Sequence, residues 1–270
     1  MNKQIEKLVE TANFSLRKDV LSLLRKAYRN ETNKKSQRAL ALILENAKIA
    51  KREKLAICQD TGLPVIFIEV GRNQAVSLKL IDAIEKAVIS GYKNNYLRAS
   101  IVDPFKSNNP SYNGVVTHVE FSPQIKGIKV TIFPKGFGSE NKTRLKMFNP
   151  TAHLEQIEDF IIESVLNAGP ESCPPFVVGI GIGGTSDTAL LLAKKALLGS
   201  VDVKNKDRFL DKVEKRLLKK INALNIGPMG LGGKNTCLAV KIKTVPTHIA
   251  GLPVGVNISC HALRSATINI

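Results

Sequence analysis

The spacing of apolar residues along the chain changes near residue 55. Before it, apolar residues recur three or four positions apart, as in Ile5, Leu8 and Ala12, and this period is typical of amphipathic helices. A polar break at 32–36 interrupts the pattern, which then continues. The sequence therefore predicts a small helical region over residues 1–55.

Beyond this region, β-branched or alternating runs are interspersed with amphipathic stretches. The runs predict strands at 64–70, 115–121, 127–133, 176–182, 236–242 and 254–260, and the stretches predict helices at 76–92, 150–166, 186–197 and 205–224. We expect strands 115–121 and 127–133 to pair, and Asn149 or Thr151 to cap the helix that follows. The pattern indicates one domain over 1–270 with a mixed α/β (α+β) fold, in which the helical N-terminal region packs on a mixed-sheet body over 56–270 with flanking helices.

Length and composition are those of an ordinary folded protein. The chain has 270 residues, of which 43% are hydrophobic and 23% charged. No apolar run approaches the roughly 20 residues that a membrane helix needs, and the first residues lack the apolar segment of a secretory signal. The four cysteines are widely spaced and do not resemble a disulfide framework. These features predict a protein of the reducing cytoplasm with no membrane partner.

The chain carries a formal charge of +17, from 40 Lys and Arg against 23 Asp and Glu. A field of this sign attracts nucleic acid, acidic protein surfaces or small anions. The basic residues are spread along the chain, however, and aromatic residues, at 5%, leave few groups for stacking on single strands. Nucleic-acid binding is therefore disfavoured, and a basic nucleic-acid-binding protein stays only as an alternative.

Two glycine-rich segments resemble parts of nucleotide-binding loops. Gly179, Gly181 and Gly184 follow an expected strand and precede an expected helix, which is the context of a dinucleotide-binding turn. Asp202 lies near the place of a ribose-binding acid, but the strand that should end in that acid is missing, so a tight strand-to-helix turn is the favoured interpretation. A second segment resembles the end of a P-loop, but no Ser or Thr follows Lys234. A nicotinamide-dependent oxidoreductase remains an alternative function.

Three of the four cysteines lie in loops, where functional residues are frequent. Cys58, Cys173 and Cys260 each stand at the end of an expected element, beside Gly, Pro or polar residues, whereas Cys237 lies in an apolar strand and is expected in the core. The separations match neither a zinc ribbon nor a ferredoxin. Spacing alone therefore leaves a shared metal site open.

Six segments resemble the iron–sulfur-dependent class I fumarate hydratases and the related tartrate dehydratases. They are residues 57–62, 98–104, 135–142, 171–185, 225–234 and 246–264, so the resemblance extends through essentially the whole chain and includes the three loop cysteines. In two-component members of this family, a chain of this size is the α subunit, and a separate β subunit corresponds to the C-terminal domain of the single-chain enzymes. The resemblance implies the α subunit of a hydro-lyase that hydrates fumarate to (S)-malate in an α2β2 heterotetramer, with tartrate dehydratase as the nearest alternative.

The resemblance also implies that Cys58, Cys173 and Cys260 hold a 4Fe–4S cluster in which one iron has no protein ligand. Such an iron can bind the substrate hydroxyl and act as a Lewis acid, as a catalytic zinc does at its open position. A fourth thiolate would fill that position and favour electron transfer. The placement of Cys237 therefore tests the assignment.

Further residues are implied at a dicarboxylate substrate. Gln59 and Asp60 directly follow the first cluster cysteine and are expected at the substrate. Arg98 is expected to bind a carboxylate with its planar guanidinium. His248 is expected to contact the substrate and to take part in proton transfer with Asp60.

The segment 135–142 resembles the glycine-rich substrate loop of the family. Gly136 and Gly138 are small enough to let backbone N–H groups approach an anion closely. Phe137 departs from the family, whose members often carry a smaller residue there. His261 is expected only to orient the loop of Cys260. The catalytic base and further cationic residues are implied on the β subunit, so this chain alone should be inactive or nearly so.

Overall fold

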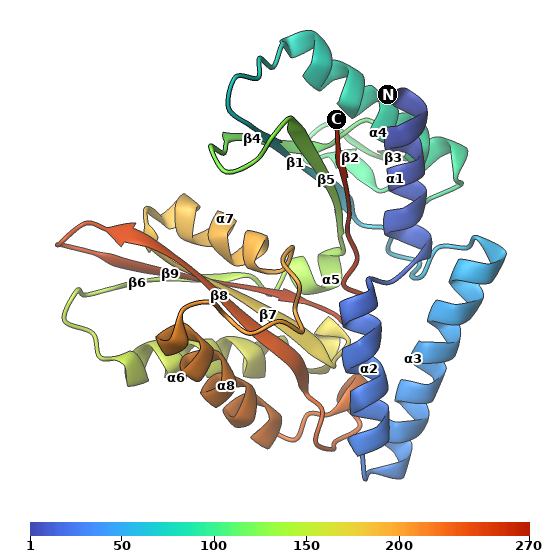
Figure 1. The fold of residues 1–270 in the computed structure, drawn as a ribbon. Coiled ribbons are helices and arrows are strands. Elements are labelled where there is room, and N and C mark those ends of the chain that lie inside the picture. The colour runs from blue at the N-terminus through green and yellow to red at the C-terminus, as the bar shows by residue number, and fades with distance from the viewer. The chain divides into compact units, whose positions relative to one another are not determined.

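The computed structural model describes residues 1–270, except for the side chains of residues 107 and 108. The chain divides into two compact units that alternate along the sequence (Figure 1). Unit 1 contains Met1–Leu16, Asn46–Phe137 and Arg264–Ile270, and unit 2 contains Arg17–Glu45 and Gly138–Leu263. With 43% helix and 24% strand in mixed sheets, the expected mixed α/β fold is confirmed.

The helical period of the first residues corresponds to three successive helices. They are α1 (Asn2–Phe14), α2 (Lys18–Asn30) and α3 (Lys34–Glu53). Glu31 lies in the break between α2 and α3, where its carboxylate accepts the backbone N–H of Asn33 at 3.0 Å. The polar break that the sequence predicts is therefore a helix-to-helix turn held by a side chain.

Unit 1 is built on a four-stranded sheet with the order β10-β5-β1-β4. Its strands are β1 (Leu63–Val70), β4 (Val116–Phe121), β5 (Ile128–Lys135) and β10 (Ala266–Asn269). Helices α1 and α4 (Leu78–Asn94) pack on each other, and their apolar side chains form one core with those of β1 and β5 (Figure 1). A separate antiparallel pair contains β2 (Ile101–Asp103) and β3 (Ser107–Ser111).

The expected pairing of strands 115–121 and 127–133 is wrong. β1 lies between them, parallel to β4 and antiparallel to β5. The reason is burial: Ile66 and Ile68 of β1 face the core under the helices, and Val65 and Phe67, on its other side, are also buried. A strand that is apolar on both faces takes a central position, whereas β4, with many exposed residues, takes the edge.

Unit 2 contains a second four-stranded sheet, with the order β6-β9-β7-β8. Its strands are β6 (Arg144–Phe148), β7 (Phe176–Gly184), β8 (Cys237–Thr247) and β9 (Leu252–Ser259). Helices α6 (Leu154–Ala168) and α8 (Arg208–Ala223) cover one face, and α7 (Ser186–Ala196) covers the other (Figure 1). Short helical turns are α5 (Phe137–Glu140), η1 (Gly169–Ser172) and η2 (Pro228–Gly230).

The expected caps of the helix near residue 150 are also wrong. The N-cap of α6 is His153, whose backbone N–H donates to Gln156 Oε1 at 2.9 Å. The side chain of Asn149 instead accepts from the backbone and hydroxyl of Thr151. Because Asn149 is engaged in this preceding turn, the helix begins only at Leu154.

The glycines of β7 allow α7 to pack closely on the sheet. A Cβ atom at Gly179 would lie 2.1 Å from the carbonyl oxygen of Ala193, and one at Gly181 would lie 2.1 Å from that of Ala189. Asp202 lies in a turn and not at the end of a strand. Close helix packing therefore accounts for the glycine pattern, and the geometry gives a dinucleotide site no support.

Side chains cover the outer edge of β8, the last strand of this sheet. The amide of Asn222 accepts the N–H of Cys237 at 2.8 Å and donates to its carbonyl at 3.2 Å, as a neighbouring strand would. Farther along, Glu214 accepts the N–H of Ile242 at 2.8 Å, and Asn205 donates to its carbonyl at 3.3 Å. At these positions the edge is closed to a further strand.

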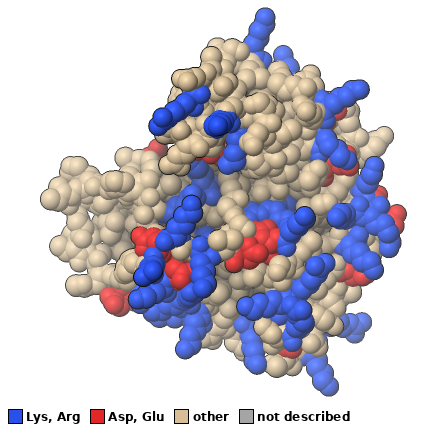
Figure 2. All heavy atoms as spheres, viewed as in Figure 1, with Lys and Arg blue, Asp and Glu red and all other residues tan. Residues whose placement is uncertain are grey.

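Lys and Arg side chains are spread over the face that Figure 2 shows, with Asp and Glu among them. Some of the chain's cations are paired with acids: Arg216 and Lys220 of α8 both bind the buried carboxylate of Glu158 on α6. The positive charge on that face is thus distributed and not gathered into one patch. None of the helices in the described part of the chain has both the length and the apolar character that crossing a membrane requires.

Candidate functional site

In unit 1, the candidate residues lie in the loop that leads into β1. The loop is anchored at its start, where Ile57 donates its N–H to the carbonyl of Asn13 at 3.0 Å and accepts from the Asn46 amide at 2.9 Å. It ends at Gly62, whose φ is +76° and where a Cβ would lie 2.8 Å from the backbone nitrogen of Lys135. Only glycine fits there, so residues 58–61 are held between two fixed points.

Both carboxylate oxygens of Asp60 are hydrogen-bonded to the backbone. Oδ1 accepts the N–H of Gly62 at 2.9 Å, and Oδ2 accepts the N–H of Phe137 at 2.7 Å. A Cβ at Gly136 would lie 3.2 Å from Oδ2, so glycine at this position gives the carboxylate its room. At Gly138 a Cβ would meet no atom closer than 3.8 Å, so packing does not require that glycine.

A cavity of about 460 Å³ lies beside Asp60. Its lining consists of Asp60, Gly62, Leu63, Ser100, Ile101, Val102 and Phe137. The walls are mainly apolar, and Asp60 and Ser100 contribute the polar side chains. Small-molecule sites usually have this form, with few polar groups in an apolar cavity of several hundred Å³.

Arg98 is tied to the same loop through its main chain. Its N–H donates to Thr61 Oγ1 at 3.2 Å, and the Thr61 hydroxyl lies 3.4 Å from its carbonyl oxygen. Thr61 is buried, and its own carbonyl accepts from the Tyr92 hydroxyl at 3.0 Å. Arg98 itself is exposed. The loop of Asp60 and the segment of Arg98 are thus brought together within unit 1.

Sequence reasoning missed the buried residues that hold this loop. Thr61 stands inside a segment that the motif covers, but its hydrogen bonds join it to Arg98, far away in the sequence. Arg264 donates from Nη2 to the carbonyl oxygen of Asp60 at 2.5 Å and is only 3% exposed. The one signal for Arg264 was its place four residues after Cys260, inside the last segment that resembles the family.

In unit 2, His261 joins the loops of Cys173 and Cys260. Its backbone N–H donates to the carbonyl oxygen of Cys173 at 3.3 Å, and its Nδ1 lies 3.0 Å from the same oxygen. Cys173 follows η1 with a φ of 51°, and Cys260 directly follows β9. The two cysteine loops are therefore neighbours in this unit, and His261 lies where a residue that orients them would be expected.

Cys58 and Gln59 belong to unit 1, where the Cys58 thiol donates to Gln59 Oε1 at 3.4 Å. Within each unit taken by itself, the described residues contain no group of three Cys, His, Asp or Glu side chains that could hold one metal ion. Cys58, Cys173 and Cys260 share a half-buried position on irregular backbone.

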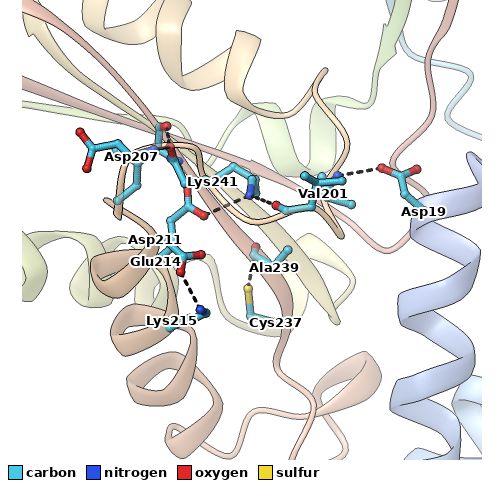
Figure 3. Close-up of polar contacts among 12 residues, drawn as sticks. Asp19, Val201, Asp207, Asp211, Glu214, Lys215, Cys237, Ala239 and Lys241 are labelled. Atoms are coloured by element: carbon cyan, nitrogen blue, oxygen red, sulfur yellow. Dashed lines mark hydrogen bonds and ion pairs between the residues drawn. The ribbon is translucent and has the colours of Figure 1, made fainter. Parts of the chain in front are cut away.

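The fourth cysteine, Cys237, is in the core of unit 2, as the sequence predicts. Its thiol donates to the carbonyl oxygen of Ala239 at 3.2 Å (Figure 3). Burial raises the pKa of the Cys237 thiol to about 12, so the thiol stays protonated at neutral pH. Farther along β8, Lys241 binds Glu214, with Nζ 3.0 Å from Oε2 (Figure 3). A protonated, enclosed thiol is a poor metal ligand.

The donor set fits an iron–sulfur cluster. Thiolate sulfur is the ligand that such clusters use, and each unit taken by itself offers it, unit 1 at Cys58 and unit 2 at Cys173 and Cys260. Beside Cys173, the hydroxyl of Ser172 is fully buried and has no hydrogen-bond partner among the described atoms. A buried donor of this kind normally has an acceptor, and cluster sulfide is one.

His248 lies in the turn between β8 and β9 and is exposed. Its Nδ1 accepts the backbone N–H of Ala250 at 3.1 Å. In the neutral ring this hydrogen bond assigns the proton to Nε2, so Nε2 is the nitrogen that can donate to a ligand.

Comparison with known proteins places the chain in one family. The model of the family described as fumarate hydratase (Fumerase) matches residues 2–269. Over 270 residues the chain is 42% identical to the "Putative L(+)-tartrate dehydratase subunit alpha" of Methanocaldococcus jannaschii, covering 97% of this chain and 94% of that protein. It is 28% identical over 281 residues to the "L(+)-tartrate dehydratase subunit alpha" of Escherichia coli (strain K12), covering 99% and 92%.

A third relative is longer. The chain is 31% identical over 279 residues to the "Putative fumarate hydratase class I" of Geobacillus stearothermophilus, which covers 97% of this chain but only 53% of that protein. These names all describe hydro-lyases, and the matches extend through both units. The chain belongs to the fumarate hydratase (Fumerase) family and is a hydro-lyase.

Proposed function

We propose that this chain is the α subunit of an iron–sulfur hydro-lyase that interconverts fumarate and (S)-malate with a separate β subunit, as an α2β2 heterotetramer. The observation that carries the proposal is Asp60, fixed beside a cavity of about 460 Å³ in a chain that matches the family over residues 2–269. Relatives of similar length are named alpha subunits, and this chain spans 53% of the longer relative named "Putative fumarate hydratase class I". A second chain would supply the remainder.

Under this proposal, Cys58, Cys173 and Cys260 hold a 4Fe–4S cluster. When bound, the cluster supplies an iron without a protein ligand, which polarises the substrate hydroxyl as a Lewis acid. Cys237 is not a fourth ligand, because its thiol is enclosed and protonated.

The chain's own residues bind the substrate and move protons. The backbone hydrogen bonds to Asp60 fix the orientation of its carboxylate, and each oxygen keeps a second lone pair for a proton or a hydroxyl group. The exposed guanidinium of Arg98 binds one substrate carboxylate in a bidentate manner. Gln59 and the Nε2–H of His248 donate further hydrogen bonds, and His248 shares the proton transfer with Asp60.

Fumarate is the favoured substrate because of the cavity walls. Leu63, Ile101, Val102 and Phe137 leave only Asp60 and Ser100 as polar side chains in the lining. Malate carries one hydroxyl and tartrate carries two, and a second hydroxyl left unpaired against an apolar wall costs about 1–3 kcal/mol. The second candidate is L(+)-tartrate, which the 42% identity to a protein named as a tartrate dehydratase subunit favours.

Anaerobic co-expression with the candidate β chain tests the proposal. Iron and sulfide are counted in the purified complex, and kcat/KM is measured for fumarate, (S)-malate and L(+)-tartrate. We expect four irons per α chain, and kcat/KM for malate at least about tenfold above that for tartrate. A preference for tartrate would select the second candidate, and a complex without iron or hydratase activity would refute the proposal.

A further inference from the structure

Arg264 is a buried cation in contact with the Asp60 loop. Only 3% of the residue is exposed, and Nη2 donates to the main-chain oxygen of Asp60 at 2.5 Å. Among the described residues, the structure gives this guanidinium a carbonyl oxygen as its partner and no carboxylate. Buried charges are normally paired, so an arginine of this kind requires an explanation.

The Nε atom of Arg264 is also buried, and it has no hydrogen-bond partner among the described atoms. A guanidinium that leaves a buried N–H unpaired stabilises a fold poorly, and an apolar side chain of similar size often serves the fold as well or better. Stability alone therefore does not account for arginine at this position.

The contact of Arg264 acts on the residue that lines the cavity. Its partner is the main-chain carbonyl of Asp60, the residue whose carboxylate accepts the N–H groups of Gly62 and Phe137. Arg264 therefore fixes the main chain of Asp60, and the two N–H groups fix its carboxylate.

The Tyr92 hydroxyl lies within the influence of both the Arg264 and the Asp60 charge. Burial is the main cause that raises the pKa of its hydroxyl, the charge of Arg264 opposes this shift, and the charge of Asp60 adds to it. The hydroxyl therefore stays protonated and donates to the Thr61 carbonyl at 3.0 Å. The loop is thus fixed by Tyr92 at Thr61 and by Arg264 at Asp60.

We propose that Arg264 is a positioning residue for Asp60, which fixes the main chain behind the carboxylate and adds a buried positive charge that favours a carboxylate ligand in the adjacent cavity. The identity of that ligand as a four-carbon dicarboxylate rests on the proposed function. The positioning of Asp60 does not depend on it.

The test compares Arg264→Met and Arg264→Lys with the wild type in the αβ complex. In Arg264→Met, we expect amide hydrogen exchange in the segments that contain Gly62 and Phe137 to be at least about tenfold faster, and kcat to fall about 100-fold. The Kd of succinate, a non-reacting dicarboxylate, should weaken at least about tenfold. Arg264→Lys keeps the charge but not the planar donor, so we expect it to restore succinate binding to within about threefold while kcat stays low.

Arg17→Met is the matched control. Arg17 is a second largely buried arginine that donates to main-chain carbonyls, those of Leu197 and Gly199, but it is paired with Asp19. Removing it leaves Asp19 without its cation, so we expect a lower melting temperature with unchanged exchange at Gly62 and unchanged kcat. We expect Arg264→Met to shift the melting temperature less than Arg17→Met does.

Unchanged exchange at Gly62 and Phe137 in Arg264→Met would overturn the positioning role, as would a lowered melting temperature with normal kcat. Equal succinate affinity in Arg264→Met and wild type, or no succinate binding by the wild type, would overturn the role of the charge. Exchange and succinate binding are also measured on the cluster-free complex. A complex without hydratase activity would therefore refute the proposed function while the exchange data still decide the role of Arg264.

Discussion

At the scale of single residues, the four thiols differ in their surroundings. Cys237 is enclosed in the core, where burial raises the pKa of its thiol to about 12, whereas the other three lie half-buried in loops. We expect Cys58→Ser, Cys173→Ser and Cys260→Ser each to abolish the visible absorbance of the cluster in the anaerobic αβ complex, because one thiolate ligand is lost. Cys237→Ser should keep it. Equal loss from all four variants would contradict the three-ligand assignment.

A second prediction at this scale concerns the room beside Asp60. In Gly136→Ala, the new Cβ would lie 3.2 Å from Asp60 Oδ2, so the carboxylate must shift by a few tenths of an ångström. We expect kcat to fall about tenfold or more with little change in KM, because a displaced proton-transfer group acts on the chemical step. Steady-state kinetics of the αβ complex measure both constants.

Gly199→Ala is the control for this substitution, since a Cβ at Gly199 has nothing within 4 Å. Its kinetic constants should equal those of the wild type. If Gly136→Ala also behaved like the wild type, the carboxylate of Asp60 would not depend on its present position.

Sequence reasoning found the candidate residues that carry motifs, but not those that hold them. Asp60, Arg98 and the cysteines stand in segments whose order of residue types is informative by itself. Thr61 and Arg264 act through hydrogen bonds to residues far away in the sequence, and no local pattern distinguishes them from an ordinary buried Thr or Arg. Only the fold reveals such contacts.

At the scale of elements, α6 and α8 are joined by a buried charge cluster. Although burial of Glu158 acts in the opposite direction, hydrogen bonds from Arg216 and Lys220 hold the pKa of its carboxyl below the usual 4.5. A lowered folded-state pKa stabilises the fold above the ordinary pKa, and this contribution is lost as the pH falls through the folded value. The cluster therefore favours the native state at neutral pH.

We expect Glu158→Gln to lower the free energy of unfolding by about 1–3 kcal/mol at pH 7, because two cations lose a buried partner. As the pH falls below the ordinary pKa of 4.5, the difference from the wild type should shrink, because the unfolded chain then gains a proton at this carboxyl before the native state does. Urea unfolding at pH 7 and at pH 4 measures it. Glu163→Gln, which removes an exposed partner of Arg144, serves as control and should have little effect. A constant difference at both pH values would exclude the ionised carboxylate as the cause.

Elements with a strong period were predictable, and their partners were not. The helices over 1–55 and strand β1 follow from local periodicity, but nothing in the sequences of β4 and β5 shows that β1 lies between them. Strand β6 went unrecognised because charged Arg144 and Lys146 alternate with its apolar residues, although both cations pack on the ring of Phe160. Strand β8 extends beyond the predicted end at residue 242 and includes Pro246, because an edge strand tolerates a missing N–H.

At the scale of the whole molecule, the proposal assigns only part of an active site to this chain. The chain spans 53% of the relative named "Putative fumarate hydratase class I", and the base and further cations are proposed on the β subunit. We expect the purified, cluster-loaded chain alone to show less than about 1% of the kcat/KM of the αβ complex, because single catalytic groups are typically worth a hundredfold or more. Strong activity of the isolated chain would contradict a divided site, and adding the β chain should restore activity.

Under the proposed function, the covered edge of β8 has a consequence for the time between synthesis of this chain and its binding to a β subunit. An exposed outer strand is a template on which further copies can stack, and the danger is greatest while a subunit is still alone. Here Asn222 and Glu214, both on α8, accept hydrogen bonds from the backbone of that strand within the chain itself. The edge of β8 is therefore protected from pairing with a second copy of the chain, and the unassembled chain does not aggregate through this edge.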